Sequence, residues 1–237
     1  MLGSATPHRL RIALIHATAL AVEPIRAALQ QHWPHVQCMN LLDDSLSVDL
    51  AQAGALTPAI TQRFVDLAGY AKRAGCSGIL FTCSAFGLAI EAAGAAVGLP
   101  TLKPNQAMLE DALALCPQPG AKLGLLATFA NSLPPMAREL QALAEVRGQN
   151  IHLQTAFVPE AMQDLALGHA GLHHQKIAAA AQALLKTMGD CQVVLLAQFS
   201  MAAALPMVQA ALPGWRGQVL TSPDCAVRAL RKTMGHD

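Results

Sequence analysis

The chain of 237 residues is 53% hydrophobic and only 13% charged, with a formal net charge of +1. That length suits one large core or two smaller ones, and the lack of a basic stripe argues against a nucleic-acid partner, because phosphate contacts need clustered Lys and Arg. Mean hydropathy is positive, yet the apolar runs are interrupted within about a dozen residues, short of the roughly 20 that cross a bilayer, so no membrane partner is expected.

The first half alternates short apolar runs with longer amphipathic segments. We predict strands over residues 10–16, 36–41, 76–83 and 99–102, and helices over 23–33, 57–73, 86–97 and the stretch ending at 115. Residues 43–47, Asp-Asp-Ser-Leu-Ser, are interpreted as a solvated loop. The Pro-Gln-Pro-Gly segment at 117–120 is the strongest turn signal and the natural boundary between halves.

The second half repeats the alternation. Strands are predicted over residues 122–127, 151–157, 192–197 and 219–221, and helices over 134–147, a short segment ending near 168, a long segment ending at 188, 202–212, and a closing segment that begins at 222–224. This order predicts an α/β fold with parallel sheets. We divide it into halves 1–117 and 118–237, with the C-terminal helix a candidate to pack across both.

Two echoes in the sequence suggest that the halves are related. Gly75-Cys76 and the predicted strand after it resemble Asp190-Cys191 and the predicted strand that follows, at an offset of 115 residues. The run ending in Ala17-Thr18 resembles the run ending in Ala127-Thr128, at an offset of 110 residues. Repeats of a strand context at half the chain length indicate two similar units.

Six cysteines occur without CxxC or regular spacing. No secretory signal is recognisable at residues 1–11, so we expect reduced thiols and a cytoplasmic location. No metal-binding motif or glycine-rich nucleotide loop is present, and the adjacent His173 and His174 would point to different sides of a helix. The expected cofactor is therefore none, and the expected metal is none.

One cysteine has neighbours that suggest chemistry. Cys83 lies between Thr82 and Ser84, where a predicted buried strand turns into a helix. Backbone N–H groups at such a corner can hold an anion, and a helix N-terminus is expected to lower the pKa of the thiol. The alternative is that Cys83 is a small apolar residue packed at the end of a strand.

Several segments carry a family resemblance across nearly the whole chain. They are Ile12 to Ala17, the Phe81-Thr82-Cys83-Ser84 corner, Leu125 to Thr128, Phe157 to His173, and the Leu195-Leu196-Ala197-Gln198 corner. In this order they resemble the aspartate/glutamate/hydantoin racemase superfamily. The resemblance implies two α/β halves related by a pseudo-twofold axis, with a small carboxylate substrate in the cleft between them and no cofactor or metal. It also implies one cysteine from each half, acting as base and acid on opposite faces of the substrate.

The chain departs from that pattern in the second half. Cys83 is present, but the matching corner reads Gln198-Phe199-Ser200. An amide is neither an acid nor a base at neutral pH, and an unaided serine hydroxyl is too weak an acid. We therefore predict an isomerase of this superfamily that acts on an amino acid, hydantoin or dicarboxylate through the single thiol of Cys83. The alternatives are an arylmalonate-type decarboxylase and a non-catalytic small-acid-binding member, and a homo-oligomer is also considered.

The remaining candidates are polar side chains at strand ends. Thr82, Ser84, Thr128 and Asn131 either bind the substrate carboxylate or cap helices. Gln198 and Ser200 either bind substrate opposite Cys83 or form a simple corner turn. His16 either serves as a second proton carrier and substrate contact or is a satisfied histidine at the end of a strand.

Overall fold

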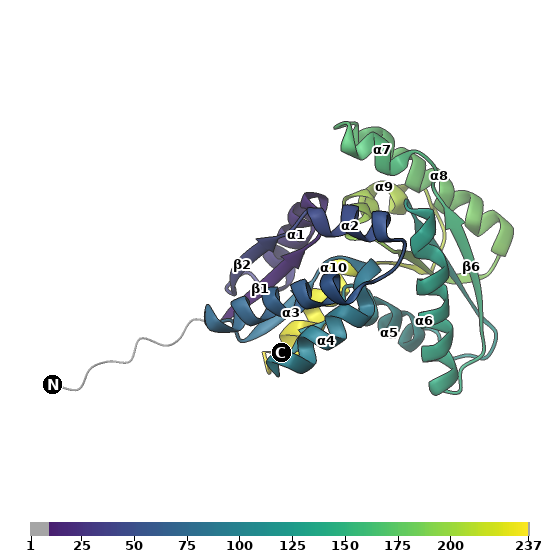
Figure 1. Ribbon diagram of the computed structural model, residues 1–237. Coiled ribbons are helices and arrows are strands. Elements are labelled where there is room, and N and C mark those ends of the chain that lie inside the picture. The colour runs from purple at the N-terminus through teal and green to yellow at the C-terminus, as the bar shows by residue number, and fades with distance from the viewer. Residues whose placement is uncertain (1–9, 237) are drawn as a thin grey trace.

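The computed structural model describes residues 10–236, which form two four-stranded sheets with helices packed on them (Figure 1). The first sheet has the strand order β2-β1-β3-β4 and the second the order β6-β5-β7-β8, so the strands correspond one to one. All of these strands pair in parallel. The predicted α/β fold with two similar parallel-sheet halves is confirmed.

The first half contains β1 (Arg11–His16), η1 (Ala19–Ala21), α1 (Val22–His32), β2 (Gln37–Leu42), α2 (Ser45–Ala53), α3 (Pro58–Arg73), β3 (Gly78–Phe81), η2 (Ser84–Phe86), α4 (Gly87–Val97), β4 (Thr101–Leu102) and α5 (Gln106–Leu115). The η elements are short 3-10 helices. The second half contains β5 (Ala121–Ala127), η3 (Ala130–Ser132), α6 (Leu133–Val146), β6 (Ile151–Phe157), α7 (Ala161–Ala166), α8 (Ala170–Met188), β7 (Cys191–Leu196), η4 (Phe199–Ala204), α9 (Leu205–Ala210), β8 (Gln218–Thr221) and α10 (Ser222–Thr233).

The inner strands are buried on both faces. All of β3, residues 12–16 of β1, 123–127 of β5 and 193–196 of β7 are buried. Helices cover both sides of a parallel sheet, which is why these strands are continuous apolar runs rather than alternating ones. The edge strands β2 and β6 alternate between partly buried and exposed residues along most of their length.

Each half packs one of its helices against the sheet of the other half. Helix α5 buries Met108, Leu109 and Leu113 in a core shared with β5 and β7 of the second sheet. Helix α10 buries Val227 and Leu230 in a core shared with β1, β3 and α1 of the first sheet, and Figure 1 shows the yellow α10 among the blue elements of the first half. The two exchanged helices therefore tie the halves together.

A buried hydrogen bond joins the starts of the exchanged helices. The Ser222 hydroxyl, at the first residue of α10, lies 2.6 Å from the Asn105 Oδ1, just before α5. At the far end of α10, Gly78 leaves room for Met234, since an added Cβ would approach the Met234 Sδ to 2.6 Å. The start of α10 is therefore held next to α5, and its far end is held against the first sheet.

The structure corrects three sequence predictions. Residues 43–47 are not all loop, because α2 begins at Ser45 and its Leu46 is fully buried in the core of the first half. The helix after Cys83 begins at Gly87, preceded by one 3-10 turn. The strand ends His16 and Ala127 correspond at an offset of 111 residues rather than 110, so the equivalent of Thr128 is Ala17 and not Thr18.

No helix within residues 10–236 combines the length and the apolar character needed to cross a membrane.

Candidate active site

Cys83 follows the end of β3 by two residues, at the carboxyl edge of the first sheet. The side chain is partly buried and packs against the core of the first half. Burial raises the pKa of the Cys83 thiol, and the nearby Ala85 backbone N–H and Ser47 hydroxyl offset that rise only in part. The expectation of a lowered pKa was wrong, because the α-helix starts four residues later and burial outweighs the nearby donors.

A buried polar chain backs this corner. The His16 Nδ1 lies 2.8 Å from the Thr82 Oγ1, and the His16 Nε2 lies 3.0 Å from the Asn40 Oδ1. Burial lowers the pKa of His16 while the Asn40 hydrogen bond opposes the change, so the ring is neutral at pH 7. Because Asn40 Oδ1 can only accept, the Nε2 carries the proton and the Nδ1 accepts from the Thr82 hydroxyl. Both nitrogens of His16 are thereby occupied by protein partners, and the side chain is fully buried.

The corresponding corner of the second half is held by a different pair. Gln198 follows the end of β7 by two residues, as Cys83 follows β3. Its Oε1 accepts hydrogen bonds from the Thr128 backbone N–H at 2.6 Å and from the Thr128 hydroxyl at 2.8 Å. The amide is therefore oriented by its oxygen, and its NH2 group is the part left to bind a ligand.

Ser200, two residues after Gln198, has a buried hydroxyl group without a hydrogen-bond partner among the described residues. The backbone oxygen of Ser200 lies 3.3 Å from the Nε2 of the fully buried His173, whose Nδ1 lies 2.7 Å from the Ala161 backbone oxygen. Both ring nitrogens of His173 thus face backbone oxygens, and the shorter contact, to Ala161, is the stronger hydrogen bond. His173 therefore supports the second corner rather than holding a metal.

The other predicted polar residues differ in their placement. Ser84 is partly buried in the 3-10 turn directly after Cys83, whereas Asn131 is exposed in η3. Thr82 and Thr128 are both buried, and their hydroxyls contact His16 and Gln198 rather than a helix terminus. Thr82 and Thr128 were interpreted either as substrate-binding residues or as helix caps, and their hydrogen bonds do not fit helix capping.

The two halves meet where η1 contacts η4. Phe199, which follows Gln198, is buried in the same apolar cluster as Ile12, Leu14 and Leu80 of the first sheet. This contact anchors the second corner on the first half. Cys83 and Gln198 each lie at the carboxyl edge of their own sheet.

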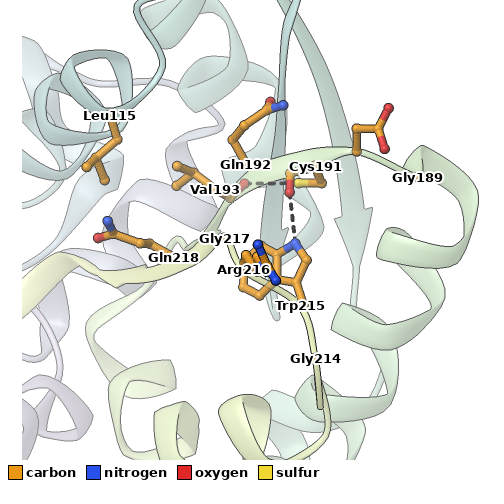
Figure 2. Close-up of a pocket in the computed structure, with 11 residues that line it drawn as sticks. Leu115, Gly189, Cys191, Gln192, Val193, Gly214, Trp215, Arg216, Gly217 and Gln218 are labelled. Atoms are coloured by element: carbon orange, nitrogen blue, oxygen red, sulfur yellow. Dashed lines mark hydrogen bonds between the residues drawn. The ribbon is translucent and has the colours of Figure 1, made fainter.

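A cavity of about 460 Å³ lies elsewhere, at the start of β7 and β8 (Figure 2). Asp190, Trp215 and Arg216 are among its lining residues, and the Trp215 Nε1 donates to the Cys191 backbone oxygen at 2.8 Å. It sits at the strand ends opposite to Gln198, and none of the predicted site residues lines it. Within residues 10–236, no group of three or more His, Cys, Asp or Glu side chains could hold a metal ion.

The family model for Asp/Glu/hydantoin racemases matches residues 12–230, which include both corners. The chain belongs to the Asp/Glu/hydantoin racemase family. This membership confirms the resemblance carried by the strand-end segments. Comparison with curated protein sequences gave no match.

Solved structures of racemases and a decarboxylase share this racemase-family fold. A glutamate racemase from Bacillus anthracis has a TM-score of 0.69 at 14% identity, covering 98% of this chain and 84% of that chain. An allantoin racemase from Klebsiella pneumoniae has a TM-score of 0.66 at 14% identity, covering 95% and 87%. Unliganded arylmalonate decarboxylase has a TM-score of 0.63 at 14% identity, covering 95% and 93%. At these identities the likeness shows the fold alone.

Two residues near Cys83 escaped the sequence reasoning. Asn40 lies within a predicted strand, and the register of β1 with β2 pairs it with Leu14, from where its side chain reaches His16. Ser47 was placed in a loop, although an Asp before Leu46 and Leu50, four residues apart, is a helix-start signal that could have identified α2.

Proposed function

We propose that this protein is a cofactor-independent enzyme that moves a proton at the carbon beside the carboxylate of a small substrate, with Cys83 as its single reacting thiol. The observation that carries the proposal is the position of that sulfur. In parallel α/β sheets, ligands bind at the carboxyl ends of the strands. Of the six cysteines, Cys83 alone directly follows the carboxyl end of a strand.

The second corner supports a carboxylate at the opposite side of the site. A buried hydroxyl without a partner is costly, so the Ser200 Oγ is suited to donate to a ligand oxygen. The Gln198 NH2 can donate beside it while Thr128 holds the amide oxygen. Two donors of this kind bind a carboxylate, and neither is a proton acid, so proton transfer falls to Cys83 alone.

Membership of the Asp/Glu/hydantoin racemase family favours an isomerase. In the isomerase reaction, the thiolate form of Cys83 removes the proton next to the carboxylate, and a water molecule on the opposite face gives a proton to the carbanion. The Cys83 thiol then loses its proton to solvent, which restores the thiolate. The substrate would be an amino acid, a hydantoin or a dicarboxylate. His16 lies in the same half as Cys83, with both nitrogens occupied, so it does not supply an acid on the opposite face.

A lyase is the second candidate, and the raised pKa of Cys83 favours it. A thiol that is protonated at neutral pH is ready to donate first. In decarboxylation of a substituted malonate, the C–C bond to one carboxylate breaks, CO2 leaves, and the electron pair stays on the carbon. That carbon takes the proton of the Cys83 thiol, and the resulting thiolate regains a proton from water.

Proton exchange with solvent tests the proposal. The protein is incubated in D2O with amino acids, hydantoins or substituted malonates, and NMR follows deuterium at the α-carbon while CO2 release is measured. Deuterium incorporation without CO2 supports the isomerase, and CO2 release with one deuterium per product supports the lyase. Protection of Cys83 from iodoacetamide by a carboxylate that shows neither reaction would instead indicate a binding protein, and would overturn the enzymatic proposal.

A further inference from the structure

Helix α2 brings a hydroxyl to the reacting sulfur. The Ser47 Oγ donates to the Ala17 backbone oxygen at 3.1 Å. Ala17 follows β1, and the parallel register that pairs Ile15 with Phe81 places Ala17 beside Cys83. The same hydroxyl is near enough to the Cys83 sulfur to oppose the rise in the pKa of the thiol. Ser47 therefore donates to a neutral carbonyl while it stands next to the thiol.

Helix α2 has little packing of its own to hold it there. Leu46 is its one fully buried side chain, Leu50 is only partly buried against the same core, and Val48 is 53% exposed. A short helix with a single buried anchor is marginal, because helical stability in proteins comes mostly from tertiary packing. Something else must fix the position of Ser47.

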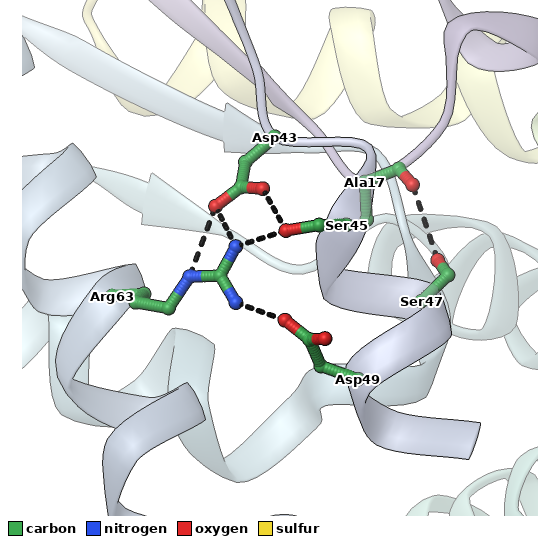
Figure 3. A network of polar contacts seen from close by, with 6 residues as sticks. All are labelled: Ala17, Asp43, Ser45, Ser47, Asp49 and Arg63. Carbon is green, nitrogen blue, oxygen red and sulfur yellow. Dashed lines mark hydrogen bonds and ion pairs between the residues drawn. The ribbon is translucent and has the colours of Figure 1, made fainter. Parts of the chain in front are cut away.

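Arg63 of α3 supplies that fixation (Figure 3). Its guanidinium contacts Asp43 through Nε at 3.0 Å and through Nη2, and contacts Asp49 through Nη1 at 2.5 Å. Nη2 also donates to the Ser45 hydroxyl at 2.6 Å. We call this group, Arg63 with Asp43, Ser45 and Asp49, the Arg63 clasp. It joins one cation to two carboxylates on either side of Ser47, an arrangement stronger than a single surface ion pair.

We propose that Ser47 moves its hydrogen bond from the Ala17 oxygen to the Cys83 sulfur when the thiol gives up its proton, and that the Arg63 clasp holds α2 where this exchange is possible. The inference rests on the proposed function, because that function supplies the reaction in which Cys83 loses its proton. Its test needs no substrate and does not depend on that function. The Cys83 proton passes to the substrate carbon, whereas the Ser47 proton stays on its own oxygen and only turns about the Cβ–Oγ bond.

The physical reason is the difference between the two acceptors. A hydrogen bond to a charged sulfur is roughly twice as strong as one to a neutral carbonyl. While Cys83 is protonated, the Ser47 hydroxyl donates to the Ala17 oxygen. Once the thiolate forms, its negative charge makes the sulfur the better acceptor, and the hydroxyl turns to donate to it. The Ala85 backbone N–H already faces the sulfur, so Ser47 completes a pair of donors around the thiolate.

Thiol titration tests the role of Ser47 without any substrate. Alkylation of Cys83 by iodoacetamide is followed from about pH 6 to about pH 10 by mass spectrometry of its peptide, which separates it from the other five cysteines. Ser47→Ala should slow alkylation about tenfold at pH 7.5, since losing one hydrogen bond to a charged group raises the thiol pKa. Ser47→Thr, which keeps the hydroxyl, should restore the wild-type curve.

Ser77→Ala is the matched control. It removes an exposed hydroxyl just before the opposite end of β3 and should leave the titration unchanged. An unchanged or faster reaction of Cys83 in Ser47→Ala would overturn the proposal. A slowed reaction together with an absence of proton exchange on every carboxylate would instead leave Ser47 in its role and remove the proposed function.

A second pair of variants tests the Arg63 clasp. Arg63→Gln should speed amide hydrogen exchange in residues 45–53, and the Ser47→Ala effect on alkylation should shrink from about tenfold to less than about threefold in that background. Arg138→Gln, on the second-half helix α6, is the control for removing an arginine. An undiminished Ser47→Ala effect in Arg63→Gln would show that the clasp does not position the hydroxyl.

Discussion

The two halves place different chemistry at the same point of the same topology. Two residues beyond β3 stands the thiol of Cys83, and two residues beyond β7 stands the amide of Gln198. Behind the first corner a neutral His16 links Thr82 to Asn40, whereas the equivalents of His16 and Thr82 in the second half are Ala127 and Ala197, both buried. The same architecture thus carries a thiol at one corner and an amide at the other, and we propose that the first moves the proton and the second binds the carboxylate.

The largest expected effect comes from removing the thiol. Cys83→Ser should reduce solvent deuterium exchange or decarboxylation by about a thousandfold, because a hydroxyl is too weak an acid to replace a positioned general acid. NMR and CO2 assays measure it. Cys38→Ser, at an exposed position on the edge strand β2, is the control and should retain full activity. Equal activity of both variants would remove Cys83 from the reaction.

Loss of the buried histidine should act on stability. His16→Leu leaves the buried Thr82 hydroxyl with only its long contact to the Ile15 backbone oxygen at 3.4 Å, so the free energy of unfolding should fall by about 2 to 4 kcal/mol. Urea denaturation with equal slopes measures the change. Asn40→Ala, at the exposed end of the same chain of hydrogen bonds, should cost only about 0.5 to 1 kcal/mol. Similar losses in the two variants would contradict the view that His16 organises this corner.

Making the corners alike should change the stereochemical outcome. Gln198→Cys provides a second thiol opposite Cys83, so the single enantiomer expected from one-thiol decarboxylation should become a mixture, measured by chiral chromatography. Because Thr128 loses its acceptor and the substrate loses a donor, KM should also rise about tenfold. Gln198→Met is the control, with the same rise in KM and no mixing. A single enantiomer from Gln198→Cys would argue that the two corners do not face the same carbon.

The smallest expected effect is a pH dependence of stability. The pKa of His16 is lowered in the fold by burial, so the folded protein binds fewer protons than the unfolded chain as the pH falls below about 6.5. The stability that the neutral ring provides is present above that pH and is lost as the pH falls towards its lowered pKa, by at most about 1.4 kcal/mol per pH unit. His16→Leu should lack this component of the slope in urea midpoints, and an unchanged slope would assign it to other groups.

Sequence reasoning succeeded where the signal was local and repetitive. Buried parallel strands are long apolar runs, so β1, β3, β5 and β7 could be located and the α/β fold inferred. Cys83 could be chosen as a candidate because its neighbours and its corner are contiguous in the sequence, and its catalytic role stays a prediction. The family resemblance supplied the two-halved plan.

The failures have physical causes beyond local pattern. The direction of the Cys83 pKa shift depends on how far the core buries the sulfur, which no local sequence pattern reports. Helix α2 is held by one buried leucine and the Arg63 clasp, both tertiary contacts. The offset between the two Ala-Thr segments was wrong by one residue because similar residue types do not fix which strand positions are structurally equivalent.

The exchange of α5 and α10 has a consequence for dividing the protein. A fragment ending at the turn after α5 would carry that helix away from the sheet that buries it, and would expose the face of β1 and β3 that α10 covers. Neither piece would then keep a closed interior by itself. Complementation of two separately produced pieces, rather than independent folding of either, is the behaviour this architecture requires.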